Sequence, residues 1–193
     1  MLPRLTSALV LALVSLLTAM PSTAGSVLAP MKDAARLFEL GLDQRDPVLL
    51  LAAARLRKAG PPAPEGWTDW TDMLQAARKA APTDPLIGGI ADDIASEGMR
   101  GAATGPIHNF RQIVDFDTIE LTVTGGEHAE IYVEGDDGTA LDILVRDPSG
   151  QIVCADTHPS DVAYCSWLPT KSVPHQVTVT NLGTSGRYVF LTN

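Results

Sequence analysis

The spacing of apolar residues changes near Thr104, and this change limits the chain's possible folds most strongly. From about residue 27 to 99 the apolar residues recur at helical spacing, whereas after the glycines at 101 and 105 they alternate every second residue. The first spacing builds one face of a helix and the second builds one face of a strand. The sequence therefore predicts an α+β chain, with a helical region at 25–104 and an antiparallel β-sandwich at 105–193.

The helical region contains two similar start signals. Asp46-Pro47 and Asp84-Pro85 each combine an N-cap residue with a proline at the first helical position, and they lie 38 residues apart. Another helix precedes each signal, so we expect two antiparallel helical hairpins. The alternation of helices and the alanine content resemble a tetratricopeptide array, although the period and the aromatic signature differ. Because two units are too few to stand alone, we expect this region to pack on the second domain.

Six segments in the second half have the alternation and the flanking turns of strands: TIELTVT, AEIYVE, LDILVRD, QIVC, HQVTVTN and RYVFLT. Seven or eight strands fit the length, and the regular turns predict a jelly-roll-like sandwich. The side chains expected to point inward are Ile119, Leu121, Val123, Ile131, Val133, Leu141, Ile143, Val145, Val177, Val179, Tyr188 and Phe190. We expect their neighbours in the strands to point outward.

From Glu127 to the end, the chain resembles the bacterial pre-peptidase C-terminal type of β-sandwich. The resemblance rests on EIYVEGDDGTALDILVRDPSGQIVCAD, with its acidic strand-turn-strand, and on HQVTVTNLGTSGRYVFLTN, with its aromatic last strand. It implies a module that binds, tethers or stabilises, and that in some cases binds Ca²⁺. Such modules usually accompany a catalytic domain, which is not visible here, and the cysteine-bearing loop is not part of their pattern.

The first 24 residues predict a secretory signal peptide. An apolar run from about Leu9 to Met20 follows the single positive charge of Arg4, and Pro21 and small residues follow the run. We expect cleavage after Ala24; the alternative is an uncleaved membrane anchor. The run is shorter than a membrane span usually needs, and no later segment is long and apolar enough. The sequence thus predicts a periplasmic or secreted protein without stable membrane insertion after cleavage.

Export decides how we interpret Cys154 and Cys165, the only cysteines of the chain. An oxidising compartment lets two thiols pair, and two cysteines alone cannot complete a structural zinc site. We therefore predict a disulfide that contributes on the order of 2 to 3 kcal/mol. His158 with Asp156 and Asp161 is the metal-binding alternative, but these residue types are also common in turns.

The second half is strongly acidic, with four Lys and Arg against twelve Asp and Glu after Thr104. This charge argues against binding nucleic acid. Hard cations such as Ca²⁺ prefer several oxygen ligands, so the turns suggest a calcium site. Its candidate ligands are Glu134, Asp136, Asp137, Asp142 and Asp147. The alternative is that these carboxylates cap turns and face water, since their spacing is not that of an EF-hand loop.

Three tryptophans, Trp67, Trp70 and Trp167, are candidates for stacking on a ligand such as a sugar. The alternative is structural: the first two lie at a helix entry, and Trp167 follows the second cysteine, where it could pack over the bridge. We identify no catalytic residues. GTSG near Gly183 fits a turn, and His108, His128, His158 and His175 are scattered without a metal-binding motif.

The sequence favours an exported, non-enzymatic binding or adaptor protein of the bacterial envelope, with a protein or a glycan as its partner. The alternative is a Ca²⁺-dependent or glycan-binding β-sandwich module that uses the acidic rim and exposed aromatic rings. A third hypothesis is a small hydrolase or inhibitor. We expect no cofactor unless the acidic residues bind Ca²⁺.

Overall fold

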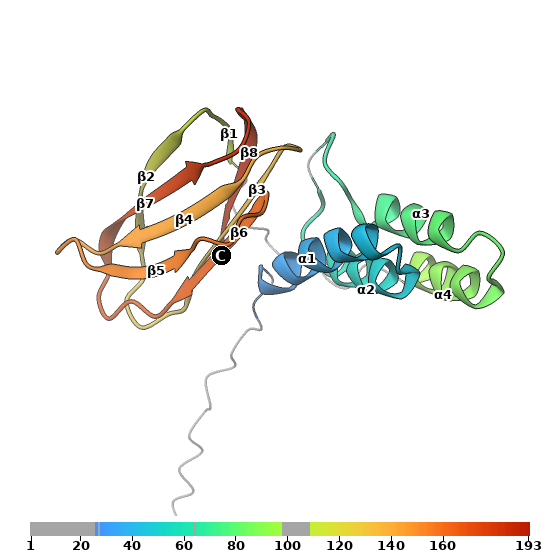
Figure 1. Ribbon diagram of the computed structural model, residues 1–193. Helices are drawn as coiled ribbons and strands as arrows, with labels where there is room; N and C mark the ends of the chain where they lie inside the picture. The colour runs from blue at the N-terminus through green and yellow to red at the C-terminus, as the bar shows by residue number, and fades with distance from the viewer. Residues whose placement is uncertain (1–25, 27, 64, 98–108) are drawn as a thin grey trace, which may run out of the picture.

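The computed structural model describes residues 26, 28–63, 65–97 and 109–193. The predicted signal peptide at 1–24, the predicted boundary near Thr104 and His108 lie outside these residues. Within them, four helices come first and two antiparallel four-stranded sheets follow, so the predicted α+β class is confirmed (Figure 1).

The four helices occupy the predicted positions. Their bounds are α1 (Ala29–Gln44), α2 (Pro47–Lys58), α3 (Trp70–Ala80) and α4 (Pro85–Ser96). The Asp46 carboxylate accepts hydrogen bonds from the amides of Val48 and Leu49, and Asp84 does the same at the start of α4. These bonds satisfy amides that have no partner within the helix, so both predicted N-caps are confirmed.

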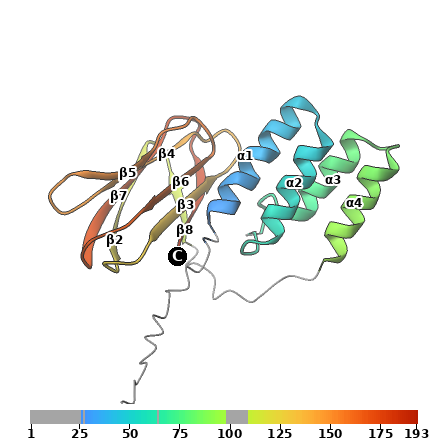
Figure 2. The ribbon, with the colours of Figure 1, turned by 90° about the horizontal axis from the view of Figure 1, so that it is seen from below.

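The helices follow one another away from the sandwich, from α1 beside it to α4 at the far end (Figure 2). Small residues allow close approach between them. Gly41 of α1 is buried against α2, where a Cβ atom would lie only 2.8 Å from the Cδ2 atom of Leu50. Alanines 53, 54, 77 and 91 are fully buried in the same core. The helices therefore pack closely together, with small side chains between them.

The sandwich contains eight strands among the described residues. Their bounds are β1 (Asn109–Ile113), β2 (Phe116–Val123), β3 (Ala129–Gly135), β4 (Leu141–Arg146), β5 (Ile152–Asp156), β6 (Val162–Trp167), β7 (Val173–Asn181) and β8 (Gly186–Thr192). One sheet has the order β1-β8-β3-β6 and the other β2-β7-β4-β5. This double-sheet order, in which most connections cross between the sheets, is that of a jelly roll. The sequence reasoning missed β1 and β6.

The predicted inward residues of the six recognised strands form the sandwich core. All but three are buried in one cluster, and the exceptions, Ile119, Leu121 and Val123 of β2, are half-buried against it. The expectation that the intervening residues point outward is wrong for β3 and β8. Tyr132, Val189 and Leu191 are buried on the opposite face of their sheet.

This second buried face packs on the helical half. Tyr132, Val189 and Leu191 join Val162 in an apolar cluster with three residues of the helical half. These are Leu28, which precedes α1, Met31 in the first turn of α1, and Trp67, which precedes α3. The helix α1 also contacts β6. We call this contact between α1, α2 and the β1-β8-β3-β6 sheet the domain junction. It confirms the prediction that the helical half packs on the second domain.

The predicted disulfide between Cys154 and Cys165 is present. Cys154 lies on β5 and Cys165 on β6, which are edge strands of different sheets. The bridge therefore joins the two sheets at one side of the sandwich. Only the chain topology gives it this position, since the two strands are consecutive in sequence but do not pair.

Candidate functional site

The most deeply buried ion pair among the described residues lies at the domain junction. Arg57 of α2 is buried, and its Nη2 atom lies 3.4 Å from Oε2 of Glu134 on β3. The hydroxyl of Tyr132, also buried, donates a 2.8 Å hydrogen bond to the same carboxylate oxygen. Burial raises the pKa of Glu134, while Arg57 and Tyr132 oppose that change. The pair therefore connects the two halves through one buried carboxylate.

A second contact crosses the junction beside the first. The hydroxyl of Ser160, in the β5–β6 loop, lies 3.4 Å from Oε1 of Glu39 on α1 and 3.3 Å from Oδ1 of Asp161. The Ser160 hydroxyl thus lies between the carboxyl groups of Glu39 and Asp161. Burial, and next the contact with Glu39, raise the pKa of Asp161 to about 7. Two acidic side chains thus meet at the junction.

A third contact connects α1 to the strand that carries the disulfide. Nη2 of Arg36 lies 3.3 Å from Oδ2 of Asp156, at the end of β5. The same carboxylate accepts a 3.0 Å hydrogen bond from the amide of Tyr164 on β6. Asp156 therefore bridges the two edge strands and the first helix. This is a structural role, in contrast to the metal-binding alternative considered for Asp156, His158 and Asp161.

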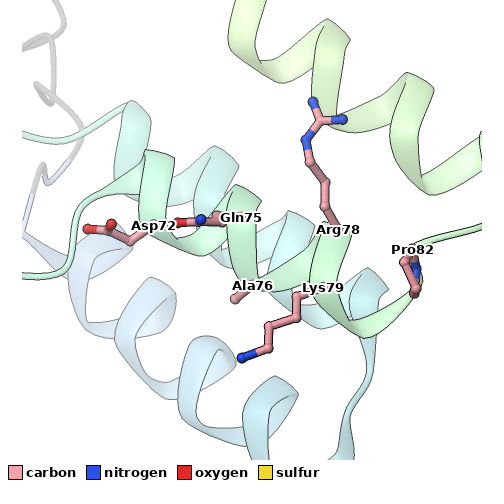
Figure 3. A pocket seen from close by; sticks show the side chains of 6 residues that line it. All are labelled: Asp72, Gln75, Ala76, Arg78, Lys79 and Pro82. Atoms are coloured by element: carbon pink, nitrogen blue, oxygen red, sulfur yellow. The ribbon is translucent and has the colours of Figure 1, made fainter.

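The helical half also carries a shallow open hollow on α3, a helix that α1 and α2 separate from the sandwich (Figure 2); Figure 3 shows the residues that line it. Five residues of α3 and Pro82 line it: Asp72, Gln75, Ala76, Arg78, Lys79 and Pro82. Arg78 extends toward α4, where its Nη2 atom lies 2.7 Å from the Asp92 carboxylate, and Lys79 extends on the other side of α3. The hollow thus combines charges of both signs with an amide and a small residue.

The structure does not bring the five predicted calcium ligands together. Glu134 faces the domain junction, while Asp136 lies in the β3–β4 turn and forms an ion pair with Arg187 at 3.1 Å. Asp137 is exposed in the same turn, Asp142 is half-buried on β4 of the other sheet, and Asp147 caps the β4–β5 turn. No group of three or more acidic, His or Cys side chains among the described residues could hold a metal ion. Calcium binding therefore stays a prediction without an assembled site.

Two of the three tryptophans are not placed for ligand stacking. Trp67 is buried at the domain junction, and Trp167 is buried in the sandwich core with its ring 5.6 Å from that of His175. Trp70 is half-buried at the start of α3, where Nζ of Lys58 lies 4.4 Å from its ring centre. The packing alternative therefore holds for Trp67 and Trp167, although Trp67 packs across the domain junction and not within its own bundle.

The sequence reasoning missed Glu39, Arg57 and Ser160. Glu39 and Arg57 lie within amphipathic helices, where charged residues are common on the solvent side. Glu39 and Ser160 are 121 residues apart in the chain. A basic residue within the apolar stripe of α2 was the one local signal, since Arg57 follows Leu50 and Ala53 at helical spacing and is itself buried.

None of the helices in the described part of the chain is long and apolar enough to cross a membrane.

No family model matches the chain, and no curated protein matches it. Among solved structures, it is similar to the pre-peptidase C-terminal domain of a Bacillus anthracis collagenase, with 11% identity and a TM-score of 0.40 over 46% of this chain and 89% of that one. It is also similar to PliG of Aeromonas hydrophila, a periplasmic inhibitor of g-type lysozyme, with 14% identity and a TM-score of 0.34 over 49% and 91%. At these values neither similarity carries an argument about function, and membership of the pre-peptidase C-terminal family stays a prediction.

Proposed function

We propose that the protein is an exported, non-enzymatic binding or adaptor protein of the bacterial envelope. In this proposal the β-sandwich and the domain junction form a stable base, and the exposed surface of α3 binds a polypeptide segment of an envelope protein. The hollow on α3 is the observation that supports this function, because it lies on the part of the array that the sandwich does not cover.

The chemistry of the hollow favours a polypeptide partner. Asp72, Gln75 and Lys79 recur at spacings of three and four residues, so they share one side of α3 with Ala76 between them. An amide side chain can pair with peptide groups, while the two charges complement side chains of either sign. The small Ala76 leaves room for a side chain of the partner.

Site-specific crosslinking tests this proposal. A photo-crosslinking amino acid at Gln75 is expected to capture one defined envelope protein from living cells. The same amino acid at Glu120, on the exposed side of β2, is the matched control and is expected to capture none. Ala76→Arg should abolish the crosslink from Gln75. Because Ala76 is half-buried against the helical core, circular dichroism of the variant must show that its helices still form.

The binding must then be reproduced with the purified partner. A dissociation constant that Ala76→Arg weakens at least tenfold would support the α3 site. Equal capture from Gln75 and Glu120, or capture that Ala76→Arg does not change, would exclude it. Retention on immobilised glycans, or turnover of a panel of generic hydrolase substrates, would favour the alternative functions.

The exported location has a separate test. Export with removal of the predicted signal peptide should yield a mature protein that begins at Gly25. Mass spectrometry of the protein from the periplasm and from the culture medium checks both the mature N-terminus and the compartment. An intact chain that stays with the membrane fraction would contradict cleavage after Ala24.

A further inference from the structure

The acidic side chains of Glu39 and Asp161 meet across the domain junction, where both lie within hydrogen-bond distance of the Ser160 hydroxyl. Glu39 lies on α1, which can move only with the helical half, while Asp161 lies in the β5–β6 loop of the sandwich. The loop is held in place by its backbone: the Ser160 carbonyl accepts a 2.7 Å hydrogen bond from Leu141, and the Asp161 carbonyl accepts a 2.8 Å bond from Gly135. The Asp161 carboxyl therefore has a fixed position against α1.

The single proton of the Ser160 hydroxyl can be donated to only one of the two carboxyl groups, so a further proton is needed for the carboxyl groups to attract each other. When both groups are ionised, each can only accept, and the two negative charges repel each other. With one proton present, the protonated group donates to the other. The contact consequently stabilises the junction when one of the two groups is protonated and destabilises it when both are ionised.

The surroundings of Asp161 strengthen this dependence on the proton. The neighbouring elements bring mostly negative charge toward it, and the cations at the junction are paired with other carboxylates. In the described chain these groups are Glu39 and Arg36 of α1, Arg57 of α2, Tyr132 and Glu134 of β3, Asp137 of the β3–β4 turn and Asp156 of β5. No cation of the described residues lies within ion-pair distance of Asp161.

We propose that Glu39 and Asp161 form a proton-dependent latch that fastens the helical half to the sandwich at acidic pH and weakens their contact as the pH rises. The proposal concerns the domain junction and does not depend on the partner proposed for α3. An exported protein meets the pH of its surroundings directly, so such a latch would couple the position of the helical array to that pH.

The direction of the effect follows from the pKa of Asp161. Its value in the closed junction, about 7, lies above its usual value of 3.8. Protonation of Asp161 therefore stabilises the closed junction fully below about pH 4, where the group is protonated in both states. This stabilising free energy declines as the pH rises and is lost above about pH 7. In that window the equilibrium constant for opening should rise with pH, with tenfold per pH unit as its upper limit. Glu39 is exposed to solvent, which reduces the effect below this limit.

Hydroxyl-radical footprinting between pH 5 and 8 tests the latch. Met31 and Trp67 are buried at the domain junction, so their side chains should lose protection from oxidation as the pH rises, relative to Trp167 of the sandwich core. Asp161→Asn keeps the shape and a hydrogen-bond donor but cannot ionise. In this variant the protection of the same side chains should be independent of pH.

Two further variants complete the test. Glu39 is exposed on α1, so Glu39→Gln should fold normally. This variant should reduce the pH dependence without removing it, because burial alone still raises the pKa of Asp161. Asp43→Asn, an exposed carboxylate one turn further along α1, is the matched control and should retain the pH dependence of the natural protein. Protection that does not change between pH 5 and 8 in the natural protein, or an unchanged pH dependence in Asp161→Asn and Glu39→Gln, would overturn the proposal.

Discussion

The two halves of the molecule build their cores from different residues. In the sandwich, fourteen buried residues include large aliphatic and aromatic side chains from both sheets, and a disulfide joins the sheets at one side. In the helical half, four of the ten residues in the main core are alanines. An alanine buries much less apolar surface than a leucine or isoleucine, so the helical core contributes less free energy per residue. We infer that the sandwich is the more stable half.

The comparison also indicates that stability differs among the four helices. α1 and α2 are fastened to the sandwich by the apolar cluster of the domain junction and by ion pairs of Arg36 and Arg57. α4 packs only within the array among the described elements, and it exposes Leu86 and Ile90. The stability of the helices should therefore decrease from α1 to α4. The proposed binding surface on α3 lies toward the less stable end.

Breaking the buried ion pair should have the largest effect on the connection between the halves. Arg57→Met leaves the Glu134 carboxylate buried without its cation, which should lower the free energy of unfolding by about 3 kcal/mol. Urea denaturation at pH 7 measures this loss. The double variant Arg57→Met with Glu134→Leu should recover most of it, because both polar groups are then replaced together. A single-variant loss below about 1 kcal/mol would show that the pair does not hold the halves together.

Opening the disulfide tests the stability assigned to the sandwich. Cys154→Ala and Cys165→Ala should each lower the free energy of unfolding by about 2 to 3 kcal/mol, since either change opens the same 11-residue loop. The double variant should cost no more than the larger single loss. Denaturation of the natural protein under reducing conditions is the matched comparison. If one single variant were neutral, the bridge would not be formed in solution.

Removing the equivalent N-caps of α2 and α4 tests whether helix stability decreases with distance from the sandwich. Asp46→Ala and Asp84→Ala each delete a cap worth about 1 kcal/mol. At α2, beside the sandwich, this loss should appear in the global unfolding of the helical half. At α4 it should appear mainly as faster hydrogen exchange confined to residues 85–96. Equal and global losses at both sites would contradict this decrease.

Calcium should have the smallest effect. The carboxylates of the predicted ligands do not converge on one position, because each has a different partner. Glu134 is paired with Arg57 and Asp136 with Arg187, while Asp147 accepts hydrogen bonds within its own turn. Millimolar Ca²⁺ is therefore expected to leave the melting temperature unchanged, with Mg²⁺ as the control for ionic strength. A saturable increase specific to Ca²⁺ would show that the acidic turns rearrange to bind it.

Much of the architecture could be predicted because its signals act between neighbours in the chain. Asp46-Pro47 and Asp84-Pro85 start helices through bonds to amides two or three residues away. Period-two alternation assigned Ile143 and Val145 to the core because successive side chains of a strand point to opposite faces. The disulfide followed from the cysteine count and the predicted signal peptide together.

The sites depended on contacts that such local signals do not specify. The jelly-roll order placed β3 and β8 side by side, which left a second apolar face for Trp67 and the first helices to cover. Tertiary packing brought Glu39 to Asp161 from the other half of the chain, and the same packing separated the acidic residues that look clustered in sequence. The sequence by itself determined the helices and their N-caps, six of the eight strands of the described chain, and the bridging cysteines. Only the tertiary structure decided which charges meet, because burial and distance are set by residues far apart in the chain.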